Sequence, residues 1–156
     1  MRENTCCFIG HRTINETEAL RAKLTETIEE LITREQVDTF LFGGKGAFDR
    51  LCHALVTELR EKYPHIKRVY VRAEFPLIRD DYRAYLLQSY EDTEYPRRIM
   101  GAGRAAYVER NYEMIDRSQY CIFYYDGQCV PTTRKSGTKI ALAYAGRKGR
   151  AMITFP

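Results

Sequence analysis

The segment TCCFIGHR, residues 5–12, sets the frame for the rest of the sequence. Its first six residues form a short, largely apolar run that ends in glycine, which is typical of a buried strand. Apolar residues then recur at helical spacing from Leu20 to about Thr33, behind a capping pair formed by Asn15 and Glu18. The sequence therefore begins with a predicted strand followed by a helix.

The alternation of strand and helix continues along the first half of the chain. The apolar segment 39–42 stops at two glycines, a second helix is predicted from about Phe48 to a point before Pro64, and a third strand at 68–72. Strands that alternate with helices in this way form parallel sheets through right-handed crossovers.

The second half contains an excursion before the same pattern returns. Residues 73–104 hold two prolines, several aromatic residues and many charges, with one helix predicted over 80–90. The elements predicted after it are a helix from about 105 to 118, a strand at 120–125, a helix at 137–148 and a strand at 151–154.

These elements predict the fold and the place of a binding site. We expect residues 1–156 to form one Rossmann-like α/β domain, doubly wound, with a five-stranded and mainly parallel sheet in the order 3-2-1-4-5 and helices on both faces. The order reverses between the first strand and the strand at 120–125, and ligands of such folds bind beyond the carboxyl ends of the strands at the reversal. A crevice is therefore predicted just beyond Gly10 and Tyr125.

Composition limits the classes of protein to be considered. The 156 residues are 44% hydrophobic and 29% charged, which argues against disorder, and no apolar stretch approaches the roughly 18 residues of a membrane span. The five cysteines are odd in number and lack zinc-ligand spacing, which favours a reducing compartment. We expect a cytoplasmic protein without a signal peptide, a membrane partner, a metal site or a cofactor.

Positive charge gathers toward the C-terminus. The net charge is +4, yet residues 127–156 carry six basic and no acidic side chains, whereas residues 13–38 carry seven acidic and three basic ones. The tail is therefore the anion-seeking end of the chain.

The last predicted helix begins inside this basic tail. Its hydroxyl groups, exposed amides and dipole, with the flanking Arg134 and Lys135, predict a phosphate site. Plain N-capping by a hydroxyl group is the alternative. The residues concerned are Ser136, Gly137 and Thr138.

Glycine-containing turns follow three of the predicted strands at one edge of the sheet. Glycine lets the backbone approach a ligand, and the helices that follow offer N–H groups to a phosphate. The spacing matches neither the dinucleotide fingerprint nor the P-loop, and tight strand-to-helix turns are the plain alternative. The candidate ligand-binding residues of these turns are Gly10, His11, Arg12, Gly43, Gly44, Gly46, Asp49, Asp126 and Gly127.

Several of these segments resemble the YpsA-like branch of the SLOG superfamily, which also contains the DprA/Smf core and the LOG phosphoribohydrolases. The resemblance spans nearly the whole chain and rests on residues 5–12, the turn with Gly46 and Asp49, the helix text ERNYEMID at 109–116, Tyr125–Gly127 and Ser136–Thr138. It implies a Rossmann-like fold and a nucleotide or nucleotide-derived ligand, with no established catalytic activity.

The chain departs from the LOG hydrolases at the last helix. Those enzymes carry Pro-Gly-Gly-x-Gly-Thr-x-x-Glu there, whereas this chain has Ala141 in the place of the carboxylate. The chain therefore lacks an acidic residue that is key to the phosphoribohydrolases.

The candidate residues have alternative roles. His11 and Arg12 suit phosphate or ribose contact, although His11 also suits a hydrogen-bonded turn. Asp49 suits either ribose hydroxyls or the dipole of its own helix. Successive helical residues lie about 100° apart, so we expect either Arg110 or Asn111 to point inward. The tyrosines of the excursion, Tyr82, Tyr85 and Tyr90, would stack on a base or cover a loop or a dimer contact.

Three functions follow from these residues. The leading one is binding or sensing of a nucleotide-like small molecule. The first alternative is hydrolysis of an N-glycosidic bond in a nucleotide or an ADP-ribose derivative, with Asp49, Asp126 or Glu109 as the carboxylate. The second is single-stranded nucleic-acid binding through the arginines of the excursion. Nucleic acid and a second copy of the chain are the secondary candidates for partners.

Overall fold

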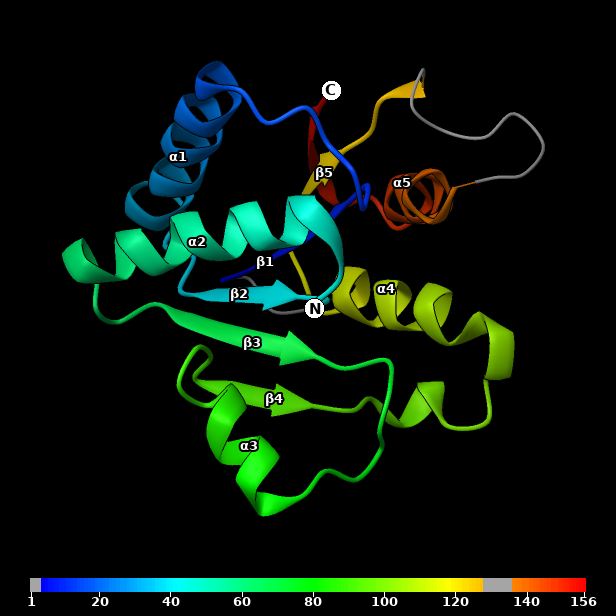
Figure 1. The fold of residues 1–156 in the computed structure, drawn as a ribbon. Helices are drawn as coiled ribbons and strands as arrows, with labels where there is room; N and C mark the ends of the chain where they lie inside the picture. The colour runs from blue at the N-terminus through cyan, green and yellow to red at the C-terminus, as the bar shows by residue number, and fades with distance from the viewer. Residues whose placement is uncertain (1–3, 128–135) are drawn as a thin grey trace.

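The strands of the computed structural model form one parallel sheet in the order β4-β3-β2-β1-β5-β6 (Figure 1). The structure describes residues 4–127 and 136–156. The strands are β1 Thr5–Gly10, β2 Thr39–Phe42, β3 Lys67–Val71, β4 Asp92–Glu94, β5 Tyr120–Tyr124 and β6 Ala151–Phe155. The helices are α1 Glu18–Thr33, α2 Gly46–Lys62, α3 Asp80–Leu86, α4 Ala106–Asp116 and α5 Gly137–Arg147, with 3-10 turns η1 Arg97–Ile99 and η2 Gly103–Ala105.

The predicted count of five strands is wrong, because the described residues form six. The additional strand, β4, has the sequence DTE and pairs with β3 through Val69↔Asp92 and Val71↔Glu94. It has no apolar run for a sequence pattern to detect. Without β4, the observed order is the predicted one, and the reversal lies between β1 and β5 as expected.

Side chains hold β4 in place of an apolar face. The buried Arg68 on β3 donates to both carboxylate oxygens of Glu91, at 3.0 and 2.7 Å. The buried Arg72 donates through Nη1 to the Thr93 hydroxyl at 2.9 Å, and that hydroxyl donates to the Tyr70 carbonyl at 3.0 Å. Charge-assisted hydrogen bonds of this kind fix a strand that hydrophobic burial alone would not.

Helices cover both faces of the sheet in a Rossmann-like α/β arrangement. Apolar residues of α1 and α2, such as Leu24 and Leu55, pack with Phe8 and Phe40 on one face. Met114 of α4 and Ala141 and Ala145 of α5 pack on the opposite face. In the described residues no helix is long and apolar enough to cross a membrane.

Two predicted helix boundaries differ from the structure. Thr17 and not Asn15 caps α1, since the Thr17 hydroxyl accepts from the Leu20 amide at 3.1 Å. The Asn15 amide instead donates to the Tyr124 hydroxyl at 3.3 Å. Helix α3 ends at Leu86 rather than at residue 90, because Tyr90 turns inward and packs against His53 with ring centroids 4.6 Å apart.

Candidate functional site

His11 joins the two strands at the reversal of the sheet. Its Nε2 accepts a hydrogen bond from the Asp126 amide at 2.9 Å, so the segment after β1 is tied to the segment after β5. The imidazole also packs edge-on against Tyr124, with ring centroids 5.9 Å apart. Because Nε2 accepts this hydrogen bond, Nδ1 is the ring nitrogen left for a ligand.

The turns after β1 and β2 are in direct contact. The Arg12 carbonyl accepts from the Ala47 amide at 2.8 Å, and the His11 carbonyl accepts from the Phe48 amide at 3.5 Å. Gly10 is needed because a Cβ there would lie 2.4 Å from the Phe48 ring. The Ala47 and Phe48 amides of α2 are therefore used by the protein, and the helix N-terminus is only partly open to an anion.

Asp49 organises the glycine turn from below. It is buried, and its Oδ1 accepts from the Gly43 amide at 2.9 Å. Burial raises the pKa of Asp49 to about 6, against the opposing effects of the Gly44 and Gly43 amides and the Arg110 charge. Its carboxylate accepts from the turn amides, and it lies in the first turn of α2, where the helix-dipole role suggested by the sequence places it. The amides of Lys45 and Gly46 are the N–H groups of the turn that no described residue uses.

Arg110 points inward from α4, as one of the two residues named in advance, and is buried. Its Nη1 donates to the Gly43 carbonyl at 2.6 Å and to the Val71 carbonyl at 3.3 Å, so it holds the ends of β2 and β3 together. Its Nε donates to the Asn111 side-chain oxygen at 3.1 Å. Burial lowers the pKa of the Arg110 guanidinium, and the charge of Asp49 opposes that effect.

Tyr107 gathers three cations above the glycine turn. The Arg12, Lys45 and Arg110 charges lie 5.9, 5.9 and 5.6 Å from the centroid of its ring. The Tyr107 hydroxyl donates to Glu74, which also pairs with the Lys45 ammonium at 3.3 Å. These two contacts lower the pKa of Glu74. We call these five residues the Tyr107 cluster; it carries three positive charges and one negative charge.

A cavity of about 290 Å³ lies on the other side of Gly44. Four of its eight lining residues are tyrosines, which come from β3, from α3 and from the segment before β4. The lining residues include Gly44, His53, Tyr70, Tyr82, Tyr85 and Tyr90. The glycine turn thus borders both a basic cluster and an aromatic cavity.

The residues at the start of α5 lie apart from these contacts. The Ser136 hydroxyl accepts from the Lys139 amide at 3.0 Å, which is ordinary N-capping, and Thr138 is buried. Gly137 has open space around its Cα. Within residues 4–127 and 136–156, no hydrogen bond joins this group to the glycine turn. Arg134 and Lys135 are outside the described residues.

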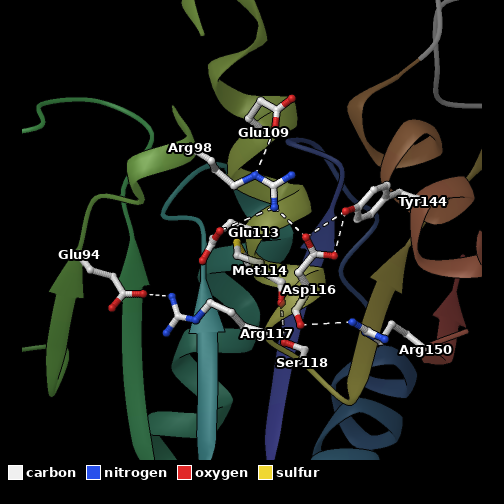
Figure 2. A network of polar contacts seen from close by, with 10 residues as sticks. All are labelled: Glu94, Arg98, Glu109, Glu113, Met114, Asp116, Arg117, Ser118, Tyr144 and Arg150. Atoms are coloured by element: carbon white, nitrogen blue, oxygen red, sulfur yellow. Dashed lines mark hydrogen bonds and ion pairs between the residues drawn. The ribbon is translucent and has the colours of Figure 1, made fainter. Parts of the chain in front are cut away.

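Glu109 belongs to an ion network that connects α4 with its neighbours (Figure 2). Arg98 of η1 donates to Glu109 at 3.2 Å and to Asp116 at 2.7 Å, and Tyr144 of α5 donates to Asp116 at 2.8 Å. Arg150 donates to the backbone carbonyl of Asp116 at 3.2 Å. The acidic residues of α4 thus attach this helix to η1 and α5.

Comparison with known proteins places the chain in a family. No protein-family model matches it. The uncharacterized SPbeta prophage-derived protein YoqJ of Bacillus subtilis is 31% identical over 148 residues, covering 81% of this chain and 80% of YoqJ. The chain belongs to the YoqJ family. YoqJ is itself uncharacterized, so membership of the YoqJ family assigns no activity to this chain.

Two parts of this YoqJ-family site were not predicted from the sequence. Tyr107 and Glu74 were missed because each lies in a helix or loop without a motif, and only the fold brings them to Lys45. The tyrosines of the excursion were among the residues named for stacking on a base, but the sequence did not predict that Tyr70 on β3 also lines the cavity. Tyr70 lies between Val69 and Val71 in a buried strand, and this pattern indicates core packing rather than a cavity wall.

A stability prediction follows for Gly46. This residue has φ +90°, and a Cβ there would lie 2.6 Å from the Arg12 Cα, a backbone atom that cannot rotate away. We expect Gly46→Ala to lower the free energy of unfolding by about 1–3 kcal/mol. Gly137→Ala is the matched control, since Gly137 starts a helix in open space and should leave stability unchanged or slightly raised. Urea denaturation of both variants measures the difference, and equal stabilities would contradict the steric account.

Proposed function

We propose that this protein binds a nucleotide or a nucleotide-derived phosphate compound at the carboxyl edge of its sheet. The observation that carries the proposal is the position of the glycine turn between the Tyr107 cluster and the aromatic cavity, with Gly44 lining the cavity and Lys45 belonging to the cluster. A nucleotide has two parts that complement them: an anionic group for the basic cluster and a flat ring for the aromatic cavity. The resemblance to the SLOG superfamily is consistent with this ligand class.

The Tyr107 cluster supplies what a phosphate group requires. Arg12 is exposed and Lys45 has 41% of its side chain exposed, so both are accessible from solvent. The Lys45 and Gly46 amides lie in the same turn. A guanidinium binds phosphate through paired N–H donors, and an ammonium adds a mobile charge beside it.

Two of the three candidate carboxylates, Asp49 and Glu109, favour binding over hydrolysis. A general acid for N-glycosidic cleavage needs an accessible carboxyl group with a raised pKa. Asp49 has the raised pKa of about 6, but it is buried and bonded to the turn amides. Glu109 is paired with Arg98, and the pKa of Glu74 is lowered. Incubation with nucleotide monophosphates and ADP-ribose, followed by mass spectrometry, is expected to return them unchanged.

A thermal-shift experiment tests the proposed function. Nucleoside monophosphates, nucleoside diphosphates and ADP-ribose are added to the wild type, and a compound at about 100 times its Kd should add about 2.7 kcal/mol of stability. We expect Arg12→Ala to weaken such binding by roughly tenfold or more, because a charged hydrogen-bond donor is lost. The wild type remaining unshifted by every compound would overturn the proposal.

Two further variants sharpen this experiment. Arg34→Ala is the matched arginine control, because Arg34 is exposed at the end of α1, which leads into the start of β2 at the opposite edge of the sheet. It should leave binding unchanged. Thr138→Ala tests whether the start of α5 belongs to the site, since loss of binding in both Arg12→Ala and Thr138→Ala would extend the site across the reversal.

Nucleic acid is separated from a small ligand by its salt dependence. Binding to several phosphates of a single strand weakens steeply with salt, because counterions are released from each phosphate. We expect an oligonucleotide to bind no more tightly than a mononucleotide at each salt concentration, as measured by fluorescence anisotropy and competition. Oligonucleotide binding that is far tighter and falls steeply with salt would favour the nucleic-acid alternative.

A further inference from the structure

The aromatic cavity has two walls that differ in burial. Tyr70 and Tyr90 form the inner wall, with ring centroids 5.3 Å apart, and Tyr90 also packs on His53. Tyr82 and Tyr85 form the outer wall on α3, where their rings are nearly parallel at 18° and 6.3 Å apart. These outer rings are 38% and 65% exposed, so large aromatic surfaces face water beside a hollow.

The polar groups of this cavity are electrically neutral. Burial raises the pKa of Tyr90 and of Tyr70, so both hydroxyls keep their protons at neutral pH. Burial also lowers the pKa of His53, which keeps the imidazole uncharged, and its Nε2 lies 2.8 Å from the Ser89 carbonyl. An anionic group gains little from these walls, whereas a flat, uncharged ring gains stacking area on the tyrosines.

The glycine turn allows the two compartments to lie close together. A Cβ on Gly44 would meet the Tyr70 ring at 2.5 Å, and Gly44 has φ +73°, so any other residue would push the turn away from the ring. Gly44 lines the cavity, and the next residue, Lys45, belongs to the Tyr107 cluster. This spacing suits a phosphate and a ring that belong to one small molecule.

We infer that the cavity is the subsite for the base of a mononucleotide, and that Tyr82 and Tyr85 determine the preference for a base over a bare sugar phosphate. The inference rests on the proposed function and extends it to the part of the ligand that the Tyr107 cluster does not contact. The volume of about 290 Å³ is at the small end of ligand pockets, which span roughly 300–1,000 Å³. It therefore suits a base, with the phosphate outside it.

Calorimetric titration of five probes tests this inference. The probes are AMP, GMP, CMP, UMP and ribose 5-phosphate. All five carry a sugar phosphate; the first four differ in their base, and the fifth has no base. We expect at least one nucleotide to bind about tenfold or more tightly than ribose 5-phosphate. Tyr82→Ala and Tyr85→Ala should each weaken that nucleotide by roughly fivefold or more, because stacking on a tyrosine is lost, and should leave ribose 5-phosphate unchanged.

The controls keep the ring or lie outside the cavity. Tyr85→Phe retains the stacking surface and should bind within about twofold of the wild type. Leu87→Ala removes a 40% exposed side chain just after the end of α3 that does not line the cavity, and it should bind like the wild type. Tyr82→Ala and Tyr85→Ala alter exposed side chains of a short helix, and circular dichroism checks that both variants fold.

The outcomes separate the two proposals. Equal affinities for nucleotides and ribose 5-phosphate, or nucleotide binding that both tyrosine-to-alanine variants retain, would overturn the base subsite. The proposed function would then still stand if Arg12→Ala weakened the same probes. If none of the five probes, nor any compound of the thermal-shift series, bound the wild type, the proposed function would fail and the base subsite with it.

Discussion

Arg110→Ala is expected to lower the free energy of unfolding by about 3–5 kcal/mol. The variant deletes a buried guanidinium that donates to the Gly43 carbonyl at 2.6 Å and to the Val71 carbonyl at 3.3 Å. Both carbonyls end strands of the sheet, and each would lose a donor in a place where water does not replace it easily. Urea denaturation near pH 7 measures the loss.

Two further variants test the cause of this loss. Arg110→Lys keeps the positive charge but has no planar fork to reach two carbonyls, so it should recover only part of the stability. Arg104→Ala removes an exposed arginine from the neighbouring turn η2 and should change stability by about 0.5 kcal/mol or less. If Arg110→Ala were as stable as Arg104→Ala, Arg110 would not hold β2 and β3 together.

Asp49 is expected to make stability fall by about 3 kcal/mol as the pH rises from about 4 to about 6. Burial raises its pKa from 3.8 to about 6, so in this interval the folded protein binds a proton that the unfolded chain has released. The stabilising contribution is therefore complete below pH 3.8 and is lost as the pH passes through about 6. Above that value the contribution is constant.

The Asn variant isolates this effect from other titrating groups. Asp49→Asn retains an oxygen that accepts from the Gly43 amide but does not titrate, so the stability difference between wild type and variant should show the fall. Denaturation midpoints across pH 4 to 7.5 measure it. In the Arg110→Ala background the fall should extend to higher pH, since the Arg110 charge normally lowers the pKa of Asp49. A difference that rose with pH would mean that the carboxylate is stabilised as an anion.

The sequence predicted the part of the fold that hydrophobic patterns encode. Apolar strands separated by amphipathic helices led to the parallel sheet, and winding rules placed the reversal between β1 and β5. Strand β4 was not predicted because its three residues are polar. This segment is held by Arg68 of β3, which bonds to Glu91 just before β4, and by Arg72 just after β3, which bonds to Thr93. Interactions between residues distant in the chain leave no local pattern.

The sequence predicted that the glycine turns lie together but not their detailed contacts. The glycine turns meet at one edge, as expected, because parallel strands bring their carboxyl ends together. The prediction that turn amides would face a ligand was only partly right, since Asp49 takes the Gly43 amide and the carbonyls before α2 take those of Ala47 and Phe48. The position of Asp49 in the sequence cannot reveal whether its carboxylate turns toward solvent or toward its own backbone.

The short polar strand at the end of the sheet also affects how the molecule meets other proteins. An edge strand with unpaired backbone groups is a template for aggregation, and long apolar edges are the most hazardous. Here the apolar β3, with Val69 and Val71, is covered by β4, whose Asp92 and Glu94 place carboxylates along the rim. A second chain that tried to extend the sheet on this side would meet only three residues of hydrogen-bonding length, so this rim resists the sheet-to-sheet association that an exposed β3 would invite. The carboxylates of Asp92 and Glu94 are paired with Arg83 and Arg117, so the rim is polar as well as short.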